Sequence, residues 1–197
     1  AVDSMRVMEV LSNATNTIPE GEVEQLLNMH DPEVTEASYF SVIEKKTAKL
    51  FEAACQLGAV VTGRADLETG LATFGRELGV AFQVADDVLD YTADADTLGK
   101  NVGDDLAEGK PTLPLILTRQ YVGEEQRSMI DEIIRKGGRD RIEQMVQLIH
   151  SSGGLEDSKA VARKRSAAAR ESIASLPESA WKDALLDLAD YSVSRNH

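Results

Sequence analysis

The sequence predicts an all-α fold. Apolar residues recur at three- and four-residue spacing along most of the 197-residue chain, as on the buried face of a helix. Aromatic residues make up only 5% of the chain, and no run of alternating β-branched residues is bounded by hairpin turns. Neither an internal repeat nor a low-complexity linker divides the periodic segments. We therefore expect a single helical domain over residues 1–197.

The charge balance is strongly acidic. The chain has 21 Lys and Arg residues against 34 Asp and Glu residues, which gives a formal net charge of -13. This balance argues against nucleic-acid binding through a general basic face. No apolar run approaches the ~20 residues of a membrane span, so we expect no transmembrane segment. The single cysteine, Cys55, fits a reducing cytoplasm rather than a disulfide framework.

Two short helices are expected at the start of the chain. The apolar spacing predicts the first over about 3–15, ending before Pro19 because proline has no N–H to donate inside a helix. A second is expected over about 21–29, between Pro19 and Pro32.

Two longer helices follow. The first is expected over about 36–62, with Thr35 as its N-cap and Gly63 at its end. Its buried stripe is predicted to comprise Phe40, Ile43, Thr47, Leu50, Phe51, Ala54 and Leu57. The second is expected over about 66–91. The remaining helices are expected over about 112–121, 124–136, 139–151, 155–175 and 178–194.

Residues 92–112, "TADADTLGKNVGDDLAEGKPT", form the one long segment without a helical pattern. Segments of this length in compact domains are usually functional or disordered. It carries Lys100, Asp105 and Lys110, together with glycines that permit tight turns. It also begins where the preceding helix ends, next to the run described below.

The run "FQVADDVLDY", residues 82–91, places three aspartates among apolar residues. At about 100° per residue, Gln83, Asp86, Asp87 and Asp90 fall within an arc of about 100° on one helix face. The like charges of Asp86 and Asp90 repel, and the nearby helix C-terminus disfavours anions. A divalent cation would reverse these effects. The run therefore predicts a Mg²⁺ site, since magnesium binds through a few carboxylates together with substrate phosphates.

Two other interpretations of these acidic residues are weaker. A solvated acidic surface is the ordinary explanation of such a cluster, but the flanking residues are too apolar for an exposed helix. A calcium-binding loop of the EF-hand type has the twelve-residue length of Asp94–Asp105. In that loop, however, Leu98 occupies the fifth position, which needs an oxygen ligand, and the twelfth is aspartate instead of glutamate.

Taken in order, the motifs resemble those of one family. "YFSVIEKKTAKLFEAACQLGA", "FQVADDVLD" and "LGKNVGDDLAEGKPTLPL" are similar to the Lys-Thr helix, the second aspartate-rich motif and the following loop of trans-isoprenyl (polyprenyl) diphosphate synthases. "GEVEQLLN" resembles the segment that precedes them. The resemblance covers essentially all 197 residues and implies an isoprenoid-synthase helical bundle around a central cavity, usually a homodimer.

The resemblance also implies a reaction. A Mg²⁺-dependent prenyltransferase of this family ionises an allylic diphosphate, here farnesyl diphosphate or longer, and isopentenyl diphosphate attacks the cation. A proton is then lost, and repeated cycles make a long all-trans polyprenyl diphosphate for quinone side chains. Metal ions and lysines suit this chemistry because the departing diphosphate is a polyanion.

The resemblance assigns metal roles to the aspartates. It implies that Asp86 binds Mg²⁺ directly, and that Asp87 and Asp90 bind the metal or hold its waters. Asp105 is expected to anchor the lysines of the following loop.

It assigns substrate roles to the other residues. Lys46, Lys100 and Lys110 are expected to contact the allylic diphosphate. Thr47 and Gln83 are expected beside the reacting carbons, where they would stabilise the cation or orient proton loss.

One departure from the family pattern is clear. The family has an earlier aspartate-rich motif with adjacent arginines, whereas Asp86–Asp90 is the only DDxxD pattern in this sequence. We therefore expect the chain to correspond to the C-terminal portion of a synthase, weak or inactive alone, with apolar surface exposed. The alternative is a noncatalytic helical subunit or remnant that binds a partner chain. A terpene cyclase is disfavoured by the Lys-Thr and Gly-Lys elements.

Overall fold

The computed structural model describes residues 3–92, 103–137 and 141–194, and these residues contain helices and no strand. The elements are α1 (Met5–Asn28), α2 (Glu36–Ile43), the π-helical turn η1 (Glu44–Ala48), α3 (Lys49–Val61), α4 (Ala65–Leu89), α6 (Asp104–Ala107), α7 (Leu113–Tyr121), α8 (Glu124–Lys136), α9 (Ile142–Ser152), α10 (Gly154–Ser172) and α11 (Ala180–Ser194). The all-α prediction is confirmed.

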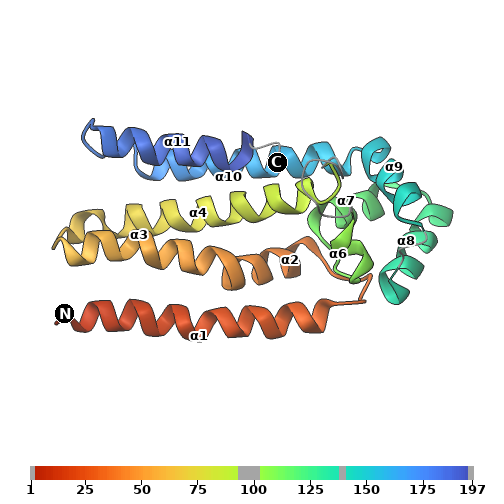
Figure 1. Ribbon diagram of the computed structural model, residues 1–197, viewed down its shortest axis with the longest axis horizontal. Helices are drawn as coiled ribbons and strands as arrows, with labels where there is room; N and C mark the ends of the chain where they lie inside the picture. Colours follow the sequence, from red (N-terminus) through yellow and green to blue (C-terminus); the bar gives the residue numbers. More distant parts are fainter. Residues whose placement is uncertain (1–2, 93–102, 138–140, 195–197) are drawn as a thin grey trace.

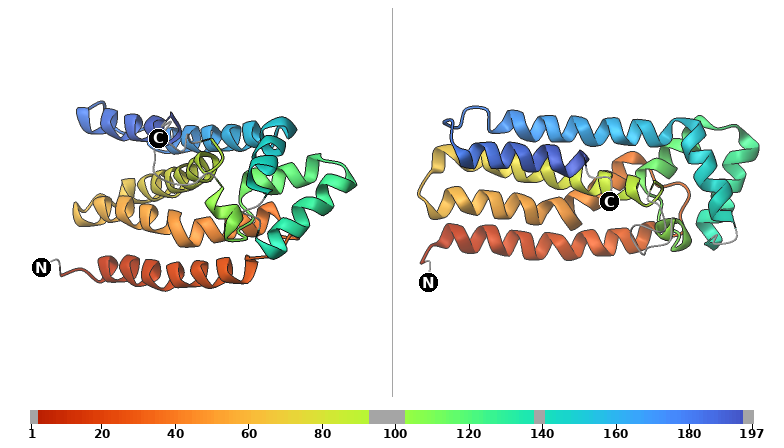
Figure 2. Two further views of the ribbon diagram at one scale, coloured as in Figure 1. Left: turned by 45° about the vertical axis from the view of Figure 1, so that its right-hand side comes forward. Right: turned by 45° about the horizontal axis from the view of Figure 1, so that its top comes forward.

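The long helices run side by side, and the short helices α6 to α9 gather at one end of them (Figures 1 and 2). Helix α4 is central, because it packs against α3 on one side and against α10 on the other. Helix α1 forms an edge of the bundle and packs against α3, η1 and α2. The aspartates near the end of α4 therefore lie where the long helices meet the group of short ones.

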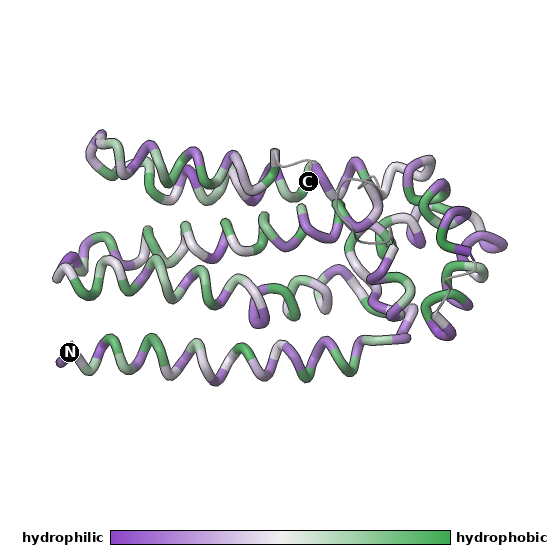
Figure 3. Tube along the Cα trace, in the orientation of Figure 1, coloured by the Kyte–Doolittle hydropathy of each residue, from purple (hydrophilic) through white to green (hydrophobic). Residues whose placement is uncertain are grey.

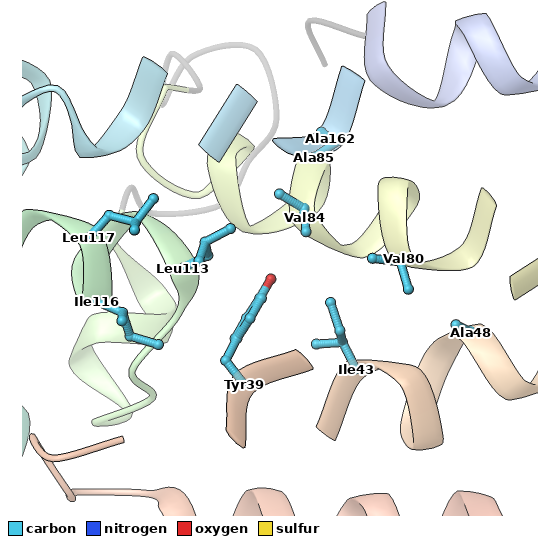
Figure 4. Close-up of a cluster of buried hydrophobic side chains, with 10 residues drawn as sticks. All are labelled: Tyr39, Ile43, Ala48, Val80, Val84, Ala85, Leu113, Ile116, Leu117 and Ala162. Carbon is cyan, nitrogen blue, oxygen red and sulfur yellow. The ribbon is translucent and has the colours of Figure 1, made fainter. Parts of the chain in front are cut away.

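A buried cluster surrounds this end of α4. Side chains from α2, α4, α7 and α10 meet there, as Figure 4 shows. The cluster comprises Tyr39, Ile43, Ala48, Val80, Val84, Ala85, Leu113, Ile116, Leu117 and Ala162. Burying each large aliphatic side chain contributes about 1.5–3 kcal/mol, so this packing holds the polar face of α4 in place.

Helix α1 corrects the prediction of two short helices divided at Pro19. It is continuous from Met5 to Asn28, with Pro19 inside it. Proline removes the hydrogen bond that the Thr15 carbonyl would accept, but Thr15 and Pro19 are both on the exposed side. Water can take that carbonyl, and packing of α1 against α3 and η1 outweighs the local cost.

The long helix expected over 36–62 is interrupted by the π-turn η1. The Thr35 N-cap and the end at Gly63, with φ of 70°, are confirmed. The π-turn inserts one residue and rotates the following face by about 100°. As a result, Leu50 and Ala54, both predicted to be buried, are exposed, Leu50 by 60%, and Ala53 is buried instead.

The later helices follow the predicted order with small shifts at their ends. The first of them, α7, runs from Leu113 to Tyr121 inside the range predicted for it. The segment expected to lack a helix contains the four-residue helix α6, Asp104–Ala107. Its Leu106 is fully buried against α8 and α9, which explains why these polar residues form a turn of helix.

Helix α1 exposes apolar side chains. Figure 3 marks the apolar residues of this helix, the lowest in the view, in green. The large ones that are exposed are Met5, Met8, Leu11, Val23, Leu26 and Leu27. This agrees with the expectation of exposed apolar surface. Of the helices described, none is long and apolar enough to cross a bilayer.

Candidate functional site

A pocket of about 200 Å³ opens between the end of α1, α2 with η1, and the polar face of α4. Its wall includes seven of the residues predicted from sequence. They are Lys46, Thr47, Gln83, Asp86, Asp87, Asp105 and Lys110. The structure therefore brings residues from three separate motifs to one cavity. Of these residues, Asp87 is buried.

Thr47, Gln83 and Asp87 are joined by hydrogen bonds. Thr47 Oγ1 donates to Gln83 Oε1 over 2.9 Å, and Gln83 Nε2 donates to Asp87 Oδ1 over 2.9 Å. The hydroxyl of Tyr39 donates to Asp87 Oδ2 over 2.6 Å. Both oxygens of the buried Asp87 carboxyl thus have protein partners.

The two adjacent aspartates of the motif lie in different environments. Asp86 is exposed at the pocket, whereas Asp87 is only 4% exposed. Burial raises the pKa of Asp87 to about 8, and the negative charges of Asp105 and Asp86 act in the same direction. The hydrogen bonds from Tyr39 and Gln83 oppose this shift of the pKa.

Asp90 follows the last residue of α4, and its carboxyl group lies at the N-terminus of α6. Its Oδ1 accepts a hydrogen bond from the Asp104 N–H, and its Oδ2 accepts one from the Asp105 N–H, both over 3.2 Å. Burial raises the pKa of Asp90 to about 6, with a further contribution from Asp105 and an opposing one from the two backbone donors. The described wall of the pocket does not include Asp90, although helical phase placed it on the same face as Asp86.

Lys46 is held at the pocket by helix α1. Its Nζ lies 2.6 Å from Gln25 Oε1 and 3.1 Å from Glu22 Oε2. Close packing makes these contacts possible, because a Cβ on Gly21 would lie 2.6 Å from the backbone nitrogen of Lys46. The neighbouring Lys45 points to a different partner, Glu24, at 2.8 Å.

Lys110 lines the same pocket from the segment that follows α6. Its Nζ is 3.3 Å from Asp105 Oδ1 and 2.5 Å from Glu108 Oε2. Burial lowers the pKa of Lys110, but the bonds to Glu108 and Asp105 outweigh it, so the pKa is raised overall. Burial has the opposite effect on Asp105: it raises the pKa of this carboxyl, and Lys110 lowers that pKa only in part. The expected link between Asp105 and a loop lysine is therefore present as an ion pair.

The turn before Lys110 is joined to the end of α1. The His30 N–H donates to the Gly109 carbonyl over 2.8 Å, and its ring Nδ1 donates to the Ile134 carbonyl over 3.0 Å. Gly109 has φ of 72°, and a Cβ there would lie 2.2 Å from the His30 ring. Only glycine fits this contact without displacing His30.

Lys100 lies outside the described residues, as does most of the Asp94–Asp105 loop considered as a calcium site. In the part of the chain that the structure describes, no three His, Cys, Asp or Glu side chains converge to hold a metal by themselves. Asp86, Asp87 and Asp105 line the same pocket without forming such a group. The donor set, all carboxylate oxygens, fits Mg²⁺.

Sequence reasoning missed three residues that hold this site together. Tyr39 was not singled out, although it comes eight residues before Thr47 in the same motif. Gln25 lies in the segment that precedes the motifs, and the three histidines of the chain, His30 among them, have no metal-ligand spacing. Their partners are distant in sequence, so periodicity carries no signal for these contacts.

Similar proteins place the chain in a family. The polyprenyl synthetase family model matches residues 1–149. Octaprenyl diphosphate synthases from Haemophilus influenzae and Escherichia coli are each 45% identical to this chain, over the whole length of the chain. The chain spans 60% and 61% of the length of these two relatives.

Solved structures agree with this assignment. One is the polyprenyl synthase from Caulobacter crescentus complexed with calcium and isoprenyl diphosphate, with a TM-score of 0.93 and 39% identity over 99% of this chain and 60% of that one. Another is a decaprenyl diphosphate synthase from Rhodobacter capsulatus, with a TM-score of 0.91 and 39% identity over 98% of this chain and 61% of that one. Together with the family match and the identity along the whole chain, this shows that the protein belongs to the polyprenyl synthetase family and has its isoprenoid-synthase fold.

Proposed function

We propose that the chain forms the diphosphate-binding part of a Mg²⁺-dependent trans-prenyltransferase, which condenses isopentenyl diphosphate with an allylic diphosphate. The observation that carries this proposal is the pocket itself. Carboxylates from α4 and from the Asp105 turn line one small cavity together with Lys46 and Lys110. Such a mixture of charges suits a polyanion that is bound through a metal and lysines together.

Each group has a distinct task in this proposal. Asp86 binds Mg²⁺, and Mg²⁺ would withdraw charge from the diphosphate as its bond to carbon breaks. Lys46 and Lys110 bind phosphate oxygens that the metal does not reach. Lys100 would add to them. Thr47 and Gln83, next to each other on the wall, stabilise the cation that forms beside them.

Asp87 and Asp90 support the metal less directly. Both oxygens of Asp87 accept hydrogen bonds within the protein, and those of Asp90 accept them from backbone N–H groups. We propose that these carboxyls hold metal-bound waters and neighbouring side chains, and that Asp105 fixes Lys110.

The relatives indicate the substrate class. Two of the most similar are octaprenyl diphosphate synthases, and the Caulobacter crescentus structure contains calcium and isoprenyl diphosphate. We propose that the product is a long all-trans polyprenyl diphosphate, octaprenyl by this likeness, used for quinone side chains. We further propose a homodimer acting in the cytoplasm.

The proposed reaction needs a second metal-binding wall. The sequence contains one DDxxD pattern, Asp86–Asp90, so an opposing aspartate-rich helix has to come from outside these 197 residues. We therefore expect diphosphate binding by the chain and weak or no turnover by the chain alone. A noncatalytic helical subunit is the competing proposal, and the exposed apolar side chains of α1 are the observation in its favour.

Calorimetric titration tests this proposal. Farnesyl diphosphate is titrated into the chain with Mg²⁺ and with excess chelator, and labelled isopentenyl diphosphate is then added to measure chain extension. We expect binding that depends on Mg²⁺ and that is lost in Asp86→Ala, because this change removes the exposed carboxylate from the pocket.

The control is Asp187→Ala, which removes an exposed aspartate on α11 far from the pocket in sequence and should leave binding unchanged. Equal Mg²⁺-dependent binding in Asp86→Ala would sink the assignment of Asp86. No diphosphate binding by the unmodified chain would favour the noncatalytic subunit.

A further inference from the structure

Four polar side chains form one continuous chain of hydrogen bonds across α2, η1 and α4. It runs from Tyr39 to Asp87 (2.6 Å), from Gln83 to Asp87 (2.9 Å) and from Thr47 to Gln83 (2.9 Å). Figure 4 shows the Tyr39 ring rising from α2 with its hydroxyl toward α4. Tyr39 is 5% exposed and Asp87 is 4% exposed, so water competes little for these bonds.

Asp87 fixes the direction of this chain. An amide side chain can present either its oxygen or its NH₂ group to a neighbour. If Gln83 turned its oxygen toward Asp87, two acceptor oxygens would face each other without a proton between them. Gln83 therefore donates from its NH₂ group to Asp87 and accepts from Thr47 at its oxygen. Thr47 then donates its single proton to Gln83. Its lone pairs are then not used by Gln83, and Thr47 lines the pocket.

Tyr39 keeps Asp87 in this role. A tyrosine hydroxyl can donate or accept, so it pairs with Asp87 Oδ2 whether the carboxyl is ionised or carries its proton on that oxygen. In both cases Oδ1 remains an acceptor for Gln83. A phenyl ring at position 39 would leave a buried Oδ2 without this partner, at a cost that favours rearrangement of the carboxyl.

The π-turn explains how Tyr39 and Thr47 reach the same neighbours. Eight residues of regular α-helix would place them about 80° apart around the axis. The extra residue in η1 takes about 100° out of the total rotation between them, so the two side chains end about 20° apart. Both then lie on the face toward α4. The local irregularity therefore places both ends of the hydrogen-bond chain against one helix.

We infer that Tyr39 is a positioning residue that acts through Asp87 and Gln83 to hold the Thr47 oxygen as an acceptor facing the forming allylic cation. This rests on the proposed function, because the cation arises only in that reaction. An oxygen lone pair fixed in advance stabilises positive charge without reorganisation, whereas a hydroxyl proton turned into the pocket would oppose it.

The test compares two diphosphate ligands that differ in the charge of the allylic part. One is an allylic diphosphate analogue with an ammonium nitrogen in place of the carbon that becomes cationic. The other, the neutral analogue, keeps an uncharged allylic group and has sulfur in place of the bridging oxygen. Titrations with Mg²⁺ give the preference of the protein for the ammonium ligand. We expect Tyr39→Phe to reduce this preference by about three- to tenfold, the effect of one hydrogen bond, with binding of the neutral analogue nearly unchanged.

Tyr91→Phe is the matched control. Tyr91 is equally buried, and its hydroxyl contacts Thr112 rather than an aspartate, so the preference should stay as in the unmodified protein. Asp87→Asn is the second variant and carries the test if Tyr39→Phe does not fold. Its effect and that of Tyr39→Phe should not add in the double variant, because both act through one chain of bonds.

The two proposals fail differently. An unmodified protein that binds both analogues, combined with an unchanged preference in Tyr39→Phe, overturns the role of Tyr39 and leaves the proposed function standing. An unmodified protein that binds neither analogue with Mg²⁺ overturns the proposed function and this inference with it. Additive effects of Tyr39→Phe and Asp87→Asn also overturn the inference.

Discussion

The three aspartates at the C-terminal end of α4 lie in three different environments. Asp86 is exposed at the pocket, Asp87 lies buried between Tyr39 and Gln83, and Asp90 accepts two backbone N–H groups. Helical phase correctly placed the first two at one cavity. It could not separate their roles, because phase gives the direction of a side chain and not its depth or its partners.

The buried carboxyl of Asp87 makes the metal-free protein sensitive to pH. Its pKa is raised from 3.8 to about 8, chiefly by burial. Between these values the folded state holds a proton that the unfolded state has released. The stability that this carboxyl contributes is therefore fully present below about pH 4 and is lost as the pH rises through about 8. With a chelator present, Asp87→Asn should flatten this decline, as measured by urea unfolding across the range.

Asp183→Asn, an exposed change on α11, should leave the decline unchanged. Equal slopes in Asp87→Asn and in the unmodified protein would contradict the assignment of the titration to Asp87.

At the scale of the elements, helical period identified most helices and their order, and Thr35 and Gly63 marked the expected ends. The errors came from tertiary packing. Pro19 lies inside α1 because its face is exposed and the opposite face packs on α3 and η1. The π-turn was invisible because an inserted residue changes the register without changing the composition.

The contact between α1 and the π-turn should tolerate no added atom. A Cβ on Gly21 would lie 2.6 Å from the Lys46 nitrogen and 2.8 Å from the Lys45 Cβ. Gly21→Ala must push the helices apart, which typically costs about 1–3 kcal/mol and should also weaken diphosphate binding through Lys46. Thermal or urea unfolding, followed by titration with pyrophosphate and Mg²⁺, measures both effects.

Gly58→Ala provides the comparison. Gly58 is also inside a helix, but no atom lies within 4 Å of an added Cβ, so we expect a gain of about 0.5–1 kcal/mol. A Gly21→Ala variant as stable as the unmodified protein would mean that α1 does not press on the π-turn.

At the scale of the whole molecule, the sequence predicted the residues of the site better than the contacts that support them. Lys46, Thr47 and Gln83 meet as the motifs indicated. The links from Tyr39 to Asp87 and from His30 to Gly109 join positions dozens of residues apart, so no local pattern could reveal them. Lys100 stays a prediction, since it lies outside the described residues.

The apolar face of α1 has a consequence for the isolated chain. Leu27 is 76% exposed and Leu26 is 66% exposed, next to other apolar side chains on the same helix. Removing such surface from water contributes about 25 cal/mol per Å², so we expect concentration-dependent self-association of the chain. Sedimentation velocity should show it, and replacing Leu26 and Leu27 together by lysine should shift the chain toward monomer.

Leu188→Lys on α11 changes another exposed leucine and should have a smaller effect. A chain that is monomeric at every concentration, or that responds equally to both sets of changes, would contradict this expectation.

Helix α1 and the segment directly after it contact the surroundings of both lysines of the pocket. Gln25 contacts Lys46 directly, and His30, two residues beyond the end of α1, bonds to Gly109 next to Lys110. A substitution that shifts α1 would therefore disturb the surroundings of Lys46 and Lys110 together.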